Sequence, residues 1–278
     1  MTSLLDNPAI QSAVLPLLLS LVLTGLLRLV LGARFGVRLA CASVALSFLA
    51  CQALIQAPVF PPRSSAQKLP YLVVAATLQG LLIDSLDLKA RVQQIAMAVL
   101  ALATIGWLLG GRFDRIDVAG WILLPMLFAA AMLAQQRCNA RRDSLDGGIL
   151  LLLAGAGIGA IALIGASASM GQVAFALMAA IGGFLLWNWP TRRFPLAATA
   201  QLSAITALLA LGTQLLFFTK ANGWALLLLA PLLLVDRVGR NNTSAALRPV
   251  LVTGAAVAVC AVAVGTAWLM VEPSTGGY

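Results

Sequence analysis

Histidine is absent from the 278 residues, and charged residues make up only 10% of them. Histidine is the commonest zinc, copper and haem ligand and the usual general base near neutral pH, so its absence argues against most metal-centred chemistry. The four cysteines are scattered without a CxxC pair, which argues against a disulfide framework or a zinc site. We therefore predict no cofactor and no metal, and these absences also weigh against an enzyme.

The scarcity of charge is matched by an excess of apolar residues. Hydrophobic residues make up 61% of the chain, and the mean hydropathy is +0.98. Soluble domains are about 45–50% apolar and about 25% charged, and one soluble core could not hide this excess. The net charge of +9 lies in short loops, which is typical of membrane topology and not of nucleic-acid binding. The composition predicts an all-α integral membrane protein, with the lipid bilayer as its first partner.

Ten apolar segments are candidates for transmembrane helices, because about 20 mostly apolar residues cross the hydrocarbon core. They are 11–31, 39–58, 69–83, 93–110, 118–135, 148–166, 171–189, 196–219, 222–235 and 249–271. Segments 69–83 and 222–235 are short for a full span, so the apolar pattern leaves their crossing open. No basic residue precedes Arg28, so we interpret the first segment as a retained helix and not a signal peptide.

The distribution of lysine and arginine supports ten crossings. With ten spans, 13 of the 18 basic residues fall in loops on one side, and removing segment 69–83, or both short segments, disrupts this asymmetry. The positive side is the cytoplasmic one. The pattern therefore predicts a multi-pass protein of the bacterial inner membrane, with both termini periplasmic and without a soluble domain.

An internal repeat is a further hypothesis within this single transmembrane domain, 1–278. Leu15-Pro16 precedes Arg28 at the same spacing as Leu124-Pro125 precedes Arg137. This similarity predicts parallel four-helix units of about 107 residues at 11–117 and 118–221, with a partial third unit at 222–271. A chain rich in alanine, leucine and glycine also aligns with itself by chance, and chance is the alternative.

The most distinctive polar stretch is 58–71, which contains four prolines. Arg63, Ser64, Ser65 and Lys68 within it could contact an anionic ligand, such as a phosphate or a lipid headgroup, or a partner. The alternative is a rigid connector, in which the prolines end one helix and begin the next.

Two charged residues adjoin apolar runs and are candidates for an intramembrane or interfacial role. Arg28 is either functional or an anchor that extends its side chain to the interface. Asp84 could carry a proton or a cation. Its alternative is an interfacial cluster with Asp87, Lys89 and Arg91, which would neutralise itself at the inner surface.

Three functions from different classes remain open. The first is a non-catalytic subunit or assembly component of a membrane complex, which the lack of buried charge favours. The second is a small permease or transporter of a solute or lipid, and the third is a lipid-linked transferase, for which Asp114 and Asp117 are the only paired outer carboxylates. Polar residues within the spans could line a solute path or form interhelical hydrogen bonds; they are Gln52, Gln56, Thr77, Gln79, Gln172, Asn188, Gln201, Thr206, Thr213 and Gln214.

Overall fold

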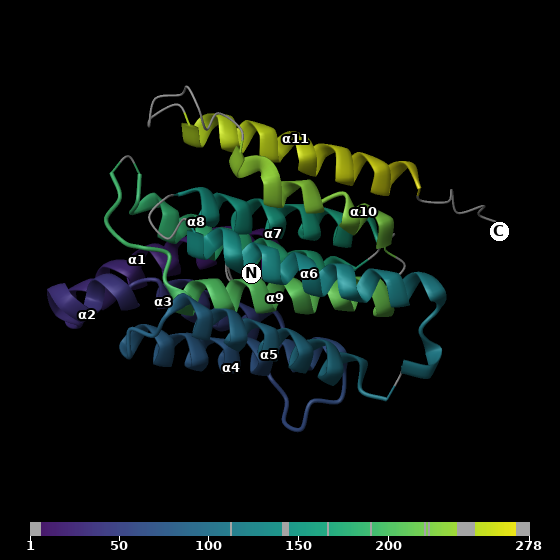
Figure 1. Ribbon diagram of the computed structural model, residues 1–278, viewed down its shortest axis with the longest axis horizontal. Helices are drawn as coiled ribbons and strands as arrows, with labels where there is room; N and C mark the ends of the chain where they lie inside the picture. Colours follow the sequence, from purple (N-terminus) through teal and green to yellow (C-terminus); the bar gives the residue numbers. More distant parts are fainter. Residues whose placement is uncertain are drawn as a thin grey trace.

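Apolar helices lying side by side make up the computed structural model, which describes residues 7–111, 113–140, 145–165, 167–189, 191–219, 221, 223–237 and 248–270 (Figure 1). No strand occurs in these ranges. In chain order the elements are η2 (Ile10–Val14), α1 (Leu15–Val30), α2 (Gly32–Leu39), α3 (Ala42–Ile55), α4 (Ser65–Ser85), α5 (Ala90–Leu109), η3 (Phe113–Arg115), α6 (Val118–Ala140), α7 (Asp146–Ile164), α8 (Ala168–Leu186), α9 (Ala198–Phe218), α10 (Gly223–Leu227), η4 (Ala230–Arg237) and α11 (Arg248–Leu269). Eight helices of the described chain are long and apolar enough to cross a membrane, which supports the prediction of a multi-pass helical membrane protein.

Helix α4 is longer than the predicted segment 69–83, because it begins four residues earlier. Ser64 and Gln67 form a capping box: the Ser64 hydroxyl accepts the Gln67 N–H, and the Gln67 side chain accepts the Ser64 N–H. This reciprocal pair satisfies backbone donors that have no partner within a first helical turn. The result is a 21-residue helix that is long enough to span.

The helix within the predicted segment 39–58 is shorter than expected. Helix α2 occupies Gly32–Leu39, and the apolar helix α3 covers only the 14 residues Ala42–Ile55. Gly32 has a φ of 71°, which glycine adopts without strain and which lets α2 fold back onto α1. Pro58 restricts the residue before it to extended conformations, and α3 ends at Ile55.

The predicted segment 222–235 is interrupted in the structure. It consists of the five-residue α10 followed by the 3-10 helix η4, which contains Pro231. Proline lacks the N–H that an α-helix interior requires, and 3-10 turns often occur where an α-helix cannot continue. This broken helix packs against α6, α7 and α11 and forms one wall of the bundle.

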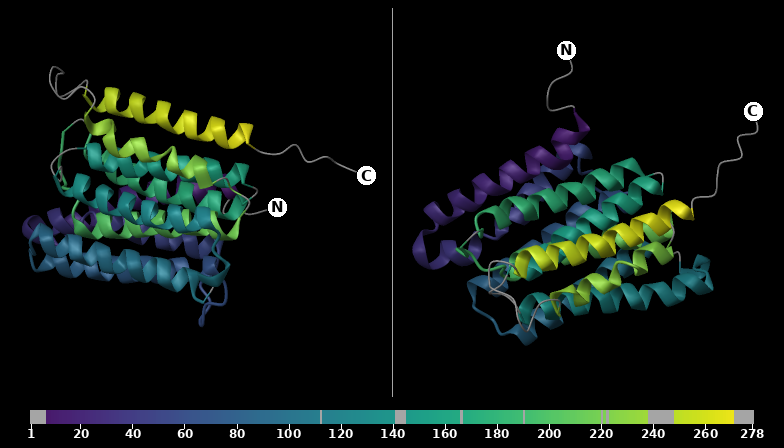
Figure 2. Two further views of the ribbon diagram at one scale, coloured as in Figure 1. Left: turned by 45° about the vertical axis from the view of Figure 1, so that its right-hand side comes forward. Right: turned by 90° about the horizontal axis from the view of Figure 1, so that it is seen from above.

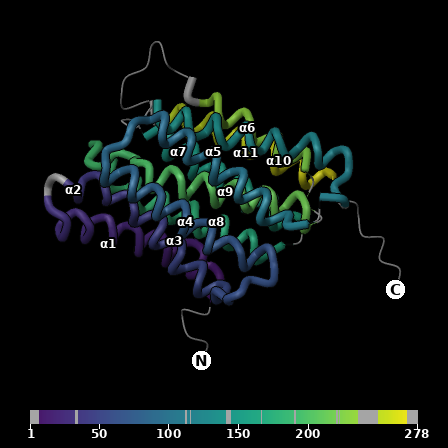
Figure 3. The backbone as a smooth tube through the Cα atoms, turned by 60° about the horizontal axis from the view of Figure 1, so that its bottom comes forward, coloured from purple at the N-terminus to yellow at the C-terminus, as the bar shows by residue number. Residues whose placement is uncertain are grey.

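Helix α9 lies in the middle of the bundle, where α3, α4, α5, α6, α7 and α8 all contact it (Figure 3). It is the most deeply buried of the eight long helices. In contrast, α1 and α11 lie at the periphery and bury little of their surface. The first turn of α1 and the last turn of α11 lie at the same end of the bundle (Figure 2).

Candidate functional site

The buried carboxylate of Asp84, near the end of α4, binds the first residues of α9. Its Oδ1 accepts the Ala198 N–H at 2.9 Å, and its Oδ2 accepts the N–H and the hydroxyl of Thr199 at 2.8 and 2.7 Å. The first N–H groups of a helix have no partner within the helix, and the helix dipole favours a negative charge there. Asp84 therefore caps a helix that is more than 100 residues away in the sequence.

Gly80 allows this close approach of α4 to α9. A Cβ atom on Gly80 would collide with the backbone of Thr199. Residues four apart share one face of a helix, so Gly80 and Asp84 present one contact surface to the start of α9. The backbones therefore approach closely at the point where the carboxylate binds.

The structure places Asp84 and Asp87, two members of the predicted interfacial cluster with Lys89 and Arg91, in different environments. Asp84 is 5% exposed and faces α9, whereas the exposed Asp87 pairs with Arg38 at 3.1 Å. The physical reason is that α4 continues to Ser85, so Asp84 still lies on its inward face, while Asp87 follows the helix end with a φ of 51°.

A second polar group, which we call the glutamine cluster, joins three helices next to this cap. The Oε1 atom of Gln201 on α9 accepts a hydrogen bond from Gln93 on α5 and one from Gln135 on α6, each at 2.7 Å. The Gln201 amide donates in turn to the Leu196 carbonyl at 2.6 Å. All three glutamines are buried. For Gln201, the prediction of interhelical hydrogen bonds is confirmed.

Beside the glutamine cluster, two residues of α6 have buried side-chain amide atoms without a hydrogen-bond partner. Neither Oε1 of Gln135 nor either amide atom of Asn139, one turn further, has a protein partner. Among the described residues, no group of three or more acidic or cysteine side chains is placed to hold a metal ion. The site thus consists of amides, one hydroxyl and one carboxylate that bind helices together.

Sequence reasoning missed Gln93 and Gln135, because they lie at the ends of the predicted segments 93–110 and 118–135, where water could satisfy them. The available signal was their position: the inner ends of three segments each carry a glutamine. Pattern alone does not show which of these helices are neighbours.

Replacing Gln201 with leucine is expected to lower the free energy of unfolding by about 2 kcal/mol, since three membrane hydrogen bonds of about 0.6 kcal/mol are lost. Gln79→Leu is the control, because Gln79 is only half-buried on α4, and we expect a change within about 0.5 kcal/mol. Unfolding in mixtures of SDS and mild detergent measures both. Equal effects would show that the glutamine cluster does not join the helices.

The residues of the predicted outer site have different partners in the structure. Arg63 has an exposed side chain before α4, and its N–H donates to Gln67. Ser64 is used in the capping box, and the carbonyl of Ser65 accepts the Gln214 amide at 3.2 Å. Lys68 lies in the first turn of α4, so the polar loop is shorter than the predicted one.

Lys68 connects α4 to the end of α5. Its ammonium group donates to the Trp107 carbonyl at 2.6 Å and lies 5.8 Å from the centre of the Trp107 ring. Tyr71 donates to the Val59 carbonyl at 3.0 Å and contacts both Phe60 and Trp107 edge-on. These contacts order the proline-rich stretch, as the connector interpretation requires.

The roles of Arg63 and Lys68 can be distinguished by replacing each residue in turn. Lys68→Met is expected to lower the free energy of unfolding by about 1 kcal/mol, because the Trp107 carbonyl loses a charged donor. Arg63→Ala is expected to leave the thermal midpoint unchanged. A loss of ligand or partner binding in Arg63→Ala alone would support the outer site, whereas normal binding in both variants would support the connector.

The remaining candidate charges occupy ordinary structural positions. Arg28 lies half-buried in the last turn of α1, a depth from which its side chain can reach the interface. Asp117 caps α6 by accepting the Gly120 N–H at 2.9 Å, while Asp114 lies in η3. The pair of carboxylates that was predicted to lie on the outer side thus includes one helix cap.

Asp84 and the glutamine cluster join α9 to α4, α5 and α6 in this helical membrane protein. No known protein family matches the chain, and no curated protein is significantly similar to it.

Proposed function

We propose that the chain is a non-catalytic subunit or assembly component of a membrane complex. The observation that supports this is the use of its intramembrane polar side chains. Thr77 and Thr213 bond carbonyls of their own helices at 2.6 and 2.8 Å, and Gln201 and Asp84 bond neighbouring helices. Polar groups used in this way stabilise a bundle and are not free to line a solute path.

The central position of α9 also favours a scaffold over a transporter. Alternating-access transporters move one group of helices against another around a binding site near the bilayer midplane. Here helices from both halves of the chain pack on α9, and Asp84 and the glutamine cluster fix its N-terminal end to α4, α5 and α6. Such an arrangement favours a rigid body that binds other membrane subunits.

The outer face of α11 offers a surface for such a subunit. Gly254, Ala258, Ala261 and Gly265 are exposed along this face, and a Cβ atom on either glycine would meet nothing within 4 Å. Small residues at such spacings let a second transmembrane helix approach closely. Helix α11 lies at the edge of the bundle, where it packs on α7 and on the broken helix α10–η4 (Figure 1).

Gly254→Leu/Gly265→Leu tests the proposal. We expect the tagged full chain to co-purify from its native membranes with a defined partner, and the double variant to lose this partner while remaining folded. The control is Val257→Leu/Val262→Leu, a matched pair of exposed positions on α11 outside the small residues. A purified chain that alone mediates solute or lipid flux in proteoliposomes would instead support the permease.

We further propose ten crossings in a bacterial inner membrane, with both termini periplasmic. The length of α4 and the location of the start of α1 and the end of α11 at one end of the bundle support an even number of crossings. Reporter fusions near residues 140 and 194 should report the cytoplasm, and a fusion at the C-terminus the periplasm. A cytoplasmic C-terminus would contradict this layout. The repeat units 11–117 and 118–221 remain a prediction.

A further inference from the structure

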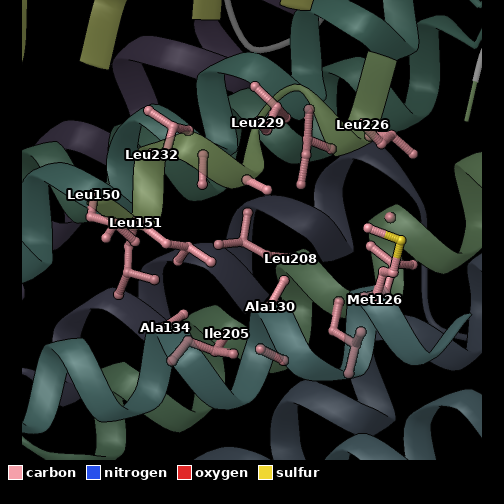
Figure 4. A pocket seen from close by; sticks show the side chains of 18 of the residues that line it. Met126, Ala130, Ala134, Leu150, Leu151, Ile205, Leu208, Leu226, Leu229 and Leu232 are labelled. Carbon is pink, nitrogen blue, oxygen red and sulfur yellow. The ribbon is translucent and has the colours of Figure 1, made fainter. Parts of the chain in front are cut away.

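A cavity of about 140 Å³ lies between α6, α7, α9 and the broken helix α10–η4 (Figure 4). Every residue that lines it is alanine, leucine, isoleucine, methionine or glycine. Water requires two to four polar partners in a cavity, and engineered apolar cavities of about 150 Å³ stay dry and bind small hydrocarbons. The lining therefore selects an apolar occupant.

The cavity is elongated along α6. Met126 and Leu226 lie at one end of it, and Leu150 and Leu151 at the other (Figure 4). On α6 the lining runs from Met126 to Ala134, a distance of about 12 Å along the helix axis. This shape suits an extended chain better than a compact molecule.

The mouth of the cavity opens toward the membrane interior. Two lining residues are exposed, Met126 at 42% and Ala230. Met126 lies about 8 Å along α6 from the exposed Trp121, and tryptophan of this kind marks the membrane interface. An occupant that enters beside the exposed Met126 therefore comes from the hydrocarbon of the bilayer.

The walls explain why the chain's own side chains do not fill this space. Small residues, Ala130, Ala134 and Gly212 among them, face the cavity where helices of a packed core would place larger ones. The break between α10 and η4 keeps the opposite wall from packing as one regular helix. We propose that this cavity binds one hydrocarbon chain of a membrane lipid.

Photolabelling of the full chain in phosphatidylcholine vesicles tests this site. The probe is a phosphatidylcholine with a diazirine in the middle of one acyl chain. We expect adducts on α6, α7 and η4 residues of the lining, at higher yield than on the exposed face of α1. Ala130→Phe fills the cavity and should lower this yield about tenfold, whereas Ala129→Phe, the adjacent exposed position, should leave it unchanged.

If Ala130→Phe does not fold, Gly212→Ala gives the same test, because a Cβ atom there makes only ordinary contact with Leu127 at 3.6 Å and should lower the yield about twofold. The proposal is overturned if the lining residues are labelled no more than the exposed face of α1. It is also overturned if folded Ala130→Phe or Gly212→Ala keeps the full yield. A partner helix that fills the cavity would protect the lining and give the first of these results.

Discussion

Replacing Asp84 with alanine is expected to lower the free energy of unfolding by about 3–5 kcal/mol, because two backbone N–H groups and one hydroxyl lose their acceptor in a buried place. The favourable interaction of the carboxylate with the N-terminus of α9 is lost as well. Asp84→Asn keeps the shape and one acceptor but loses the charge, so about half of this effect is expected. Unfolding in mixtures of SDS and mild detergent measures each variant.

Asp87→Ala is the control for this prediction. Asp87 pairs with Arg38 at the surface, and exposed ion pairs of this kind stabilise a protein by about 0–1 kcal/mol. The two carboxylates lie three residues apart, yet only Asp84 binds its second helix from a buried position. Equal stability of Asp84→Ala and the wild-type chain would contradict the capping role, and flux lost in Asp84→Asn without loss of stability would favour the carrier hypothesis.

The helices could be predicted because a membrane-spanning segment must satisfy its own backbone and bury or expose apolar side chains along its whole length. The predicted segment boundaries differ from the helix ends where a capping box or a turn, and not hydropathy, determines where a helix begins or ends. The segment 69–83 was predicted too short, although Ser64 and Gln67 have the spacing of a capping box. The segment 39–58 was predicted too long, because its apolar run includes the turn at Ala40 and Cys41 before α3 and the residues between the end of α3 at Ile55 and Pro58.

The site depends on contacts between distant segments, which apolar patterns do not specify. Asp84 could be recognised as a carboxylate next to an apolar run, but its partners Ala198 and Thr199 follow only from the packing of α4 on α9. The glutamine cluster is similar: Gln201 was a candidate for an interhelical bond, whereas Gln93 and Gln135, at the ends of their predicted segments, were not among the candidates. When α5 and α6 pack on α9, these glutamines at the ends of the predicted segments become buried and donate to Gln201.

The second large effect is expected at Gly183 on α8. A Cβ atom there would collide with the Leu17 carbonyl oxygen on α1 and lie 3.0 Å from the Ser20 side chain. A backbone oxygen cannot rotate away, so Gly183→Ala must separate α1 from α8, and we expect a loss of about 3 kcal/mol in the free energy of unfolding. Since α1 buries little of its surface, this contact is a large part of what holds it to the bundle.

The adjacent glycine is the matched control. A Cβ atom on Gly182 would meet only the Leu152 side chain, at an ordinary 3.6 Å. Alanine favours a helix interior over glycine by about 0.5–1 kcal/mol, so Gly182→Ala should leave stability unchanged or raise it. A cysteine placed on α1, followed by its rate of modification, shows whether α1 detaches first in Gly183→Ala. If both alanine variants unfold at the same denaturant fraction, the close approach of α1 to α8 is not a source of stability.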